Sequence, residues 1–167
     1  CIKETRPFIP YSELLCDFLN DLSIELRSSS ESSVYPDIMA FAFWCRKANI
    51  NKLKRGFKNG ETRLGHGVVF HITPSNVPVN FAFSFAFGLL AGNANIVKVP
   101  SNPFPQIDIL CSAIGKLFVL KKYKDIKAMN TFIRYEQNDD LTSKYSAKCN
   151  ARIIWGGDFT VNNVRKL

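Results

Sequence analysis

The sequence lacks the paired cysteines and clustered histidines that mark a structural zinc site. Its five cysteines stand at positions 1, 16, 45, 111 and 149, without a CxxC pair. The two histidines, His66 and His71, have no ligand-like neighbours, so we expect no bound metal. An odd number of cysteines without a secretory signal favours a reducing, cytoplasmic location.

The sequence also lacks a membrane-spanning segment. Its longest apolar run, Phe81 to Gly92, is shorter than the about 20 residues that cross a bilayer. Neither a targeting segment nor an internal repeat is visible. Apolar residues make up 46% and charged residues 22% of the 167 residues, which is typical of a globular domain with a sizeable core.

Basic residues exceed acidic ones, giving a formal net charge of +8. Such an excess can attract nucleic acid, an anionic membrane surface or a phosphorylated ligand. The charges are scattered, however, and the densest group (Lys52, Lys54, Arg55 and Lys58) is typical of a solvated helix end. We therefore expect no nucleic-acid partner.

Both ends of the chain indicate a piece of a longer protein. The first residue is Cys1 rather than Met, and the pattern from Val164 to Leu167 is that of the middle of a helix. We expect the chain to be the N-terminal portion of a larger enzyme.

The first part of the chain has the pattern of helices. Tyr11 to Arg27 carries apolar residues at helical spacing, and the polar run Ser28 to Ser33 predicts a flexible break. Pro36 opens a second helix, and Asn59-Gly60 predicts a turn. Residues 1–60 are therefore predicted to form an N-terminal helical segment.

Residues 61–167 are predicted to form a partial α/β domain, because strand-like and helix-like runs alternate. The predicted strands are Val68–Ile72, Asn95–Val99, Thr131–Tyr135 and Arg152–Trp155. The predicted helices are Pro78–Ala91, Pro103–Leu120 with Asn102 as its cap, Asp139–Ala147 and a last one from Phe159. This alternation favours βαβ units and a mostly parallel sheet covered on both faces.

One element is ambiguous by pattern. Its phenylalanines alternate with Ala and Ser, which is the period of a strand. Its length of about 14 residues is too great for a typical strand, and Pro78 and Gly92 stand where helix ends would place them. We therefore predict a largely buried helix.

Candidate functional residues follow the predicted strands, where α/β sheets bind their ligands. After the first strand, Asn76 stands between Pro74 and Pro78 and offers an amide donor, which can stabilise an oxyanion or simply cap the next helix. Lys98 ends the second strand and can reach a phosphate or ribose, or extend into solvent.

Gly156-Gly157 joins a strand to a helix, where glycines let backbone amides approach a pyrophosphate. Two glycines alone are a weak signal for such a site, and a plain tight turn is the more common reason for them. The carboxylate of Asp158 would compete for the same amides, or it could cap the helix.

The run from Gly67 to Ser101 closely resembles the acyl-CoA reductase family of bacterial bioluminescence, the reductase component of the fatty acid reductase complex. Tyr35–Asp37, Ala40–Ile50 and Ala151–Leu167 are similar to the same family. The resemblance covers almost the whole chain. It implies a truncated aldehyde-dehydrogenase fold, with N-terminal helices followed by a mostly parallel, Rossmann-like sheet that binds NADP.

The resemblance also implies a role for each candidate residue. Asn76 occupies the place of the asparagine that lines the oxyanion hole, and the backbone of Thr73, Pro74 and Ser75 runs beside the nicotinamide ribose. Lys98 matches the lysine that bonds the adenosine ribose. Gly156 and Gly157 fall at the pyrophosphate-binding helix.

Two departures from relatives bear on the cofactor. Ser101 stands where many NAD-dependent relatives carry a glutamate that grips the ribose. A small neutral residue leaves room for a 2′-phosphate, with which Lys98 can pair, so we expect NADPH. The run Glu136-Gln137-Asn138 stands where relatives often carry a glycine-rich turn, so adenine contacts are not carried over.

The resemblance implies that a cysteine thiolate takes the acyl group of a fatty acyl-CoA or acyl-protein thioester, and that hydride from NADPH then releases a long-chain fatty aldehyde. We expect the nucleophile to lie beyond Leu167, because Cys111 and Cys149 have no base nearby in sequence. The chain alone should therefore lack turnover. The full-length protein should be a homo-oligomer that works with acyl-transferring and acyl-activating subunits, and light production is one possible setting.

Two alternatives stay open. A short-chain CoA-acylating aldehyde dehydrogenase would share these motifs and differ in its substrate tunnel. A basic, non-catalytic module that binds nucleic acid or a protein would explain the charge, but it gives the Gly67 to Ser101 run no purpose.

Overall fold

The structure, a computed structural model, describes residues 6–57 and 63–167. The predicted turn at Asn59-Gly60 and the proposed boundary between residues 60 and 61 lie outside these ranges. In the described ranges, no helix combines the length and the apolar character needed to cross a membrane.

A four-stranded parallel sheet forms the centre of the fold. Its strands are β1 (Val68–Ile72), β2 (Ala94–Lys98), β3 (Asn130–Ile133) and β4 (Ala151–Ile154), in the spatial order β3-β2-β1-β4. The chain steps outward from β1 to β3 and then returns to pair β4 with the free side of β1. The predicted parallel sheet is confirmed, and its strand order reverses between β1 and β4.

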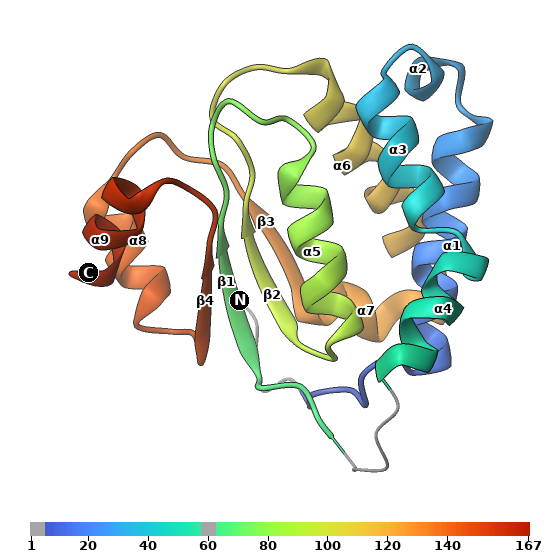
Figure 1. Cartoon of the computed structure of the whole chain (residues 1–167), viewed down its shortest axis with the longest axis horizontal. Helices are drawn as coiled ribbons and strands as arrows, with labels where there is room; N and C mark the ends of the chain where they lie inside the picture. The colour runs from blue at the N-terminus through green and yellow to red at the C-terminus, as the bar shows by residue number, and fades with distance from the viewer. Residues whose placement is uncertain (1–5, 58–62) are drawn as a thin grey trace.

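The helices cover the two faces of the sheet unequally (Figure 1). One face carries α5 (Asn80–Leu90), α6 (Pro105–Phe118), the 3₁₀ turn η1 (Lys121–Tyr123) and α7 (Lys124–Met129). Outside this layer lie α1 (Glu13–Ser28), α2 (Ser30–Ser33), α3 (Pro36–Trp44) and α4 (Lys47–Phe57), and α1 packs on α5 and α6. The opposite face carries α8 (Asp139–Ser146) and α9 (Asp158–Arg165).

Two hydrophobic clusters hold these layers together. The larger one joins the N-terminal helices to α5 and α6 through side chains such as Phe18, Phe41 and Phe85. The smaller one lies under α8 and α9 and contains Phe70, Ile72, Ile96 and Val164. Because side chains alternate along a strand, β1 gives Phe70 and Ile72 to the smaller cluster and directs His71 to the opposite face, toward α5.

The phenylalanine-rich element is the helix α5, as predicted. Phe81 and Phe85, one helical turn apart, both pack edge-on against Phe132 of β3. Phe83 and Phe87 lie on another side of the helix and contact Trp44 of α3. The alternating pattern therefore serves two packing surfaces of one helix.

Several boundaries differ from the prediction. Helix α6 begins at Pro105, and Phe104 takes the N-cap position in an extended conformation (φ −118°, ψ 131°), so Asn102 is not the cap. A residue before proline is held away from helical angles, which explains the later start. The polar run Ser28 to Ser33 is ordered in part as α2, whose Ser32 amide donates to the Ser29 hydroxyl.

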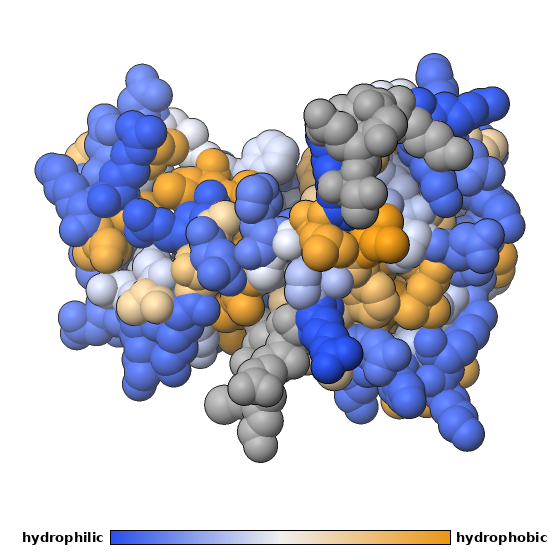
Figure 2. Space-filling view, turned by 90° about the horizontal axis from the view of Figure 1, so that it is seen from below, coloured by the Kyte–Doolittle hydropathy of each residue, from blue (hydrophilic) through white to orange (hydrophobic). Residues whose placement is uncertain are grey.

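Figure 2 views the molecule from below, which is the end at which the strands begin in Figure 1. Hydrophilic residues dominate its flanks, and hydrophobic residues show between them as separate patches. The loops that follow β1 and β2 lie at the other end, at the top of Figure 1.

A buried histidine is the least expected feature of the core. The His71 Nδ1 atom lies 2.7 Å from Ser84 Oγ, and its Nε2 atom lies 2.9 Å from Asn95 Oδ1. Burial lowers the pKa of His71 to about 4, against the hydrogen bond that the ring makes to the Asn95 side-chain oxygen, which raises the pKa. A Cβ on Gly88 of α5 would collide with both His71 and Asn95. The helix can therefore pack this close to the pair only because position 88 is a glycine.

We predict that His71 makes stability fall between pH 7 and pH 5. The unfolded histidine takes up a proton near pH 6.5, whereas the folded one stays neutral until about pH 4, so acid favours unfolding. The wild-type protein should lose about 2 kcal/mol more of its free energy of unfolding over this range than His71→Gln. Denaturant titrations at both pH values measure this difference, and parallel losses in the two proteins would contradict the assignment.

Candidate functional site

The segment after β1 is tied to the end of β2. The buried Thr73 hydroxyl donates a hydrogen bond of 2.6 Å to the carbonyl of Lys98. Asn76 lies two residues beyond Pro74 in an exposed turn. Helix α5 starts at Asn80 with Val79 at its N-cap position and no side-chain cap, so Asn76 does not cap it. Within the described ranges the Asn76 amide makes no hydrogen bond with protein, which leaves it free for a ligand.

Lys98 ends β2 with its side chain half-buried. Its Nζ atom lies 4.7 Å from the centre of the Tyr135 ring, and desolvation lowers the pKa of the ammonium. Tyr135 is itself held in place, since its hydroxyl is 3.1 Å from Thr142 Oγ1 and its ring stacks on Tyr145. No carboxylate pairs with Lys98 in the part of the chain that the structure describes, so its charge is held by an aromatic ring alone.

The turn after β4 continues the pairing with β1. The Trp155 amide donates to the Ile72 carbonyl at 2.9 Å, and the Trp155 indole Nε1 donates to Ser84 Oγ of α5 at 2.8 Å. Gly157 is the N-cap of α9, and Asp158 is the first residue of that helix rather than its cap.

Neither backbone angles nor packing explains the glycine at position 157. Its φ of −73° and ψ of 170° suit any residue, and a Cβ there would meet no atom of residues 6–57 and 63–167 within 4 Å. Its Cα therefore faces open space at the start of a helix, where backbone amides lack partners within the helix.

These segments surround one pocket of about 500 Å³, a size that suits a small-molecule ligand. It lies at the carboxyl ends of the strands, where the strand order reverses between β1 and β4. Its wall includes every residue that the sequence predicted for the site: Thr73, Pro74, Ser75, Asn76, Lys98, Ser101, Gly156 and Gly157. The structure thus brings together residues that are up to 84 positions apart (73 to 157).

The wall also contains residues that the sequence did not reveal. They come from the turn before α8 and its first residue, from the turn after β4 and from α9, and they include Gln137, Asn138, Asp139, Trp155, Phe159 and Asn163. The Asn138 side chain caps α8 by accepting from the Leu141 amide at 2.8 Å. An asparagine followed by two aspartates before a helical pattern is a capping signal that could have placed this turn.

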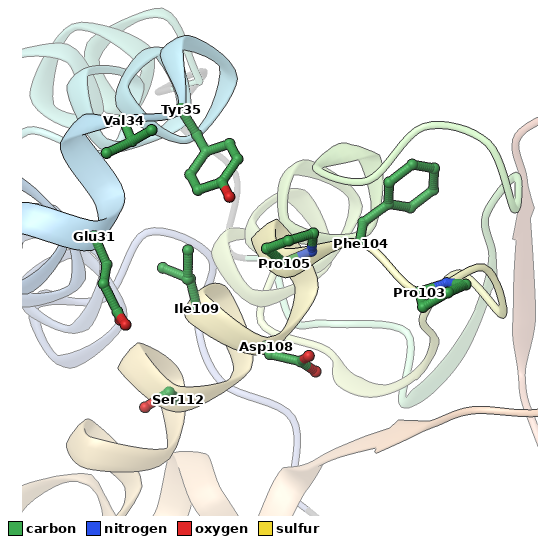
Figure 3. A pocket seen from close by; sticks show the side chains of 9 residues that line it. All are labelled: Glu31, Val34, Tyr35, Pro103, Phe104, Pro105, Asp108, Ile109 and Ser112. Atoms are coloured by element: carbon green, nitrogen blue, oxygen red, sulfur yellow. The ribbon is translucent and has the colours of Figure 1, made fainter.

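The charges on the wall suit an anionic ligand bound near Lys98. Of the described side chains that line this pocket, Lys98 is the one base and Asp139 the one acid. A second hollow, a shallow groove of about 600 Å³, lies between the α2–α3 turn and the start of α6 (Figure 3). Among the described residues, its wall carries the carboxylates of Glu31 and Asp108 and no base, so it does not suit a phosphorylated ligand.

The described cysteines are poor nucleophiles. Burial raises the pKa of the Cys111 thiol to about 11 and also raises those of Cys16, Cys45 and Cys149. The thiolate is the reactive form, so these thiols are inert near neutral pH. None of them lines the pocket that contains Asn76 and Lys98.

Comparison with known proteins agrees with this architecture. A family model described as acyl-CoA reductase (LuxC) matches residues 47–166. Among solved structures, the chain is similar to gamma-glutamyl phosphate reductase from Thermotoga maritima, with a TM-score of 0.53 and 17% identity. That similarity covers 92% of this chain and 43% of the other, and at this identity it concerns the fold. No curated protein sequence gives a significant match.

Proposed function

Because the chain belongs to the LuxC family of acyl-CoA reductases, we propose that it forms the coenzyme-binding part of an enzyme that reduces long-chain fatty acyl thioesters to aldehydes with NADPH. The observation that carries this proposal is the single pocket that gathers Asn76, Lys98 and Gly157 at the carboxyl edge of the sheet. The family match and the fold support a reductase acting on an acyl group. The choice of coenzyme and the long-chain thioester are inferred from the residues on the wall and from the family.

The residues of the pocket fit a nicotinamide coenzyme. Gly157 leaves open space before the first turn of α9, where free amides and the helix dipole favour a pyrophosphate. Lys98 has no carboxylate partner in the described ranges, so its ammonium is available to a phosphate or to ribose hydroxyls. Ser101 is small and neutral, which leaves room beside Lys98 for a 2′-phosphate.

Each side chain has one task in the proposed reaction. When bound, NADPH supplies hydride to the acyl carbon. The Asn76 amide donates to the carbonyl oxygen as negative charge develops on it, which stabilises the tetrahedral state. Thr73 uses its hydroxyl on the Lys98 carbonyl, so it acts by fixing the backbone of the 73–75 segment beside the coenzyme.

The acyl-transfer step needs a thiolate, and the described cysteines do not supply one because burial raises the pKa of each thiol. We therefore assign the acyl-cysteine intermediate to a residue outside the described ranges. Asn76 serves both half-reactions, because formation and reduction of the thioester each pass through an oxyanion.

We predict that Asn76→Ala in the intact enzyme lowers kcat for acyl-CoA reduction by about a hundredfold or more, because one oxyanion donor is lost. Steady-state rates at saturating NADPH measure this effect. Asn102→Ala is the matched control, because Asn102 is also exposed and does not line the pocket. Equal rates for the two variants would remove Asn76 from the reaction.

Ser101→Glu is expected to shift the coenzyme preference from NADPH toward NADH. A carboxylate at this position repels a 2′-phosphate and can accept hydrogen bonds from free ribose hydroxyls. The ratio of kcat/KM for the two coenzymes reports the shift, and Ser101→Ala should keep the wild-type ratio. An unchanged ratio in Ser101→Glu would count against a phosphate beside Lys98.

Gly157→Ala is expected to weaken NADPH binding by about tenfold while leaving stability nearly unchanged, because the added methyl group meets ligand rather than protein. Calorimetric titration and thermal unfolding separate the two effects. Gly115→Ala in α6, where a Cβ also meets nothing within 4 Å, should leave NADPH binding as it is. Wild-type affinity in Gly157→Ala would place the pyrophosphate elsewhere.

A further inference from the structure

A continuous chain of hydrogen bonds runs through the core from the pocket wall to β3 and α7. It begins at the Trp155 indole, which donates to Ser84 Oγ, and passes through His71 to Asn95. The Asn95 amide nitrogen then donates to Asn130 Oδ1 at 2.7 Å, and the Asn130 amide nitrogen donates to the Ile126 carbonyl at 2.6 Å. Apart from Trp155, which is partly exposed, these side chains are buried.

Backbone carbonyls fix the direction of this chain, since a carbonyl only accepts. The Asn95 nitrogen donates to the Asn93 carbonyl at 3.0 Å, so its oxygen must be the atom that faces His71. The His71 Nε2 atom therefore carries the proton. Since burial keeps the ring neutral, Nδ1 is bare and accepts the Ser84 hydroxyl proton. The Ser84 oxygen then keeps its lone pairs for the indole.

All the hydrogen bonds of this series therefore donate in the same direction, from Trp155 toward Ile126. The Trp155 indole is the first donor, at the end nearest the pocket. The backbone amide of Trp155 is bound to β1 while its side chain is bound to α5. The next two residues are Gly156 and Gly157, which have no side chains to hold the turn in place. The position of that turn relative to the segment with Asn76 is therefore set by Trp155.

We propose that Ser84 and Trp155 are positioning residues for the coenzyme: their hydrogen bond holds the Gly156-Gly157 turn against α5, the helix that follows Asn76. This inference rests on the proposed function. It assigns to Ser84, a buried side chain that does not line the pocket, a measurable effect on NADPH affinity.

A double-mutant cycle in the intact protein tests the assignment. Trp155→Phe keeps an aromatic ring without the donor, and Ser84→Ala removes the acceptor. Each should raise the Kd for NADPH by about three- to tenfold, the effect of one hydrogen bond. The double variant should bind about as well as either single variant, because both changes break the same bond. In steady-state assays, the KM for NADPH should rise in each variant, whereas kcat at saturating NADPH should stay within about twofold of the wild-type value.

Ser23→Ala is the matched control, because Ser23 is a buried helical serine whose hydroxyl accepts one hydrogen bond, from Arg27, far from the pocket. Ser23→Ala should lower the midpoint of thermal unfolding, as Ser84→Ala does, and should leave the Kd for NADPH unchanged. If Ser84→Ala does not fold, the Kd of Trp155→Phe for NADPH tests the positioning role by itself. Wild-type Kd values in the two single variants, or additive losses in the double one, overturn the positioning role; a wild-type protein that binds no NADPH overturns the proposed function with it.

Discussion

The pairing of β4 with β1 is the constraint on which the rest of the structure depends. Three strands are laid down in one direction, β1, β2 and β3, and only the return of the chain to the other side of β1 creates a crevice. That return places Ile154 beside Ile72 and so brings the Gly156-Gly157 turn next to the Thr73–Asn76 segment. Helices cover both faces of the sheet and bury its apolar side chains, and this burial stabilises the strand order.

Much of the sheet could be predicted because its strands are short apolar runs bounded by turn residues. The bounds of β1 agree with the prediction, and the other strands differ by one or two residues. The segment from Lys121 to Met129 was missed because its lysines hide a helical pattern that rests on three buried residues, Tyr123, Ile126 and Met129. The late start of α6 follows from a packed aromatic residue, Phe104, before a proline.

Eight residues of the pocket wall could be singled out from the sequence, because they follow strands and carry chemistry that a sheet edge uses, whereas the residues from α8 and α9 could not. The contacts that hold those residues were beyond the sequence. Trp155 and Ser84 are 71 positions apart, and nothing in either local pattern indicates a bond between them. Likewise His71 reads as a polar interruption of an apolar strand, and its partners on α5 and β2 become visible only when the three elements are packed.

Gly88 has a consequence for how the protein can change over evolutionary time. The His71 ring and the Asn95 amide occupy the space that a Cβ atom at position 88 would need. A larger residue at position 88 is compatible with this core only after position 71 or 95 has become smaller. Positions 71, 88 and 95 should therefore covary: among homologues, the three residues should be replaced together or retained together.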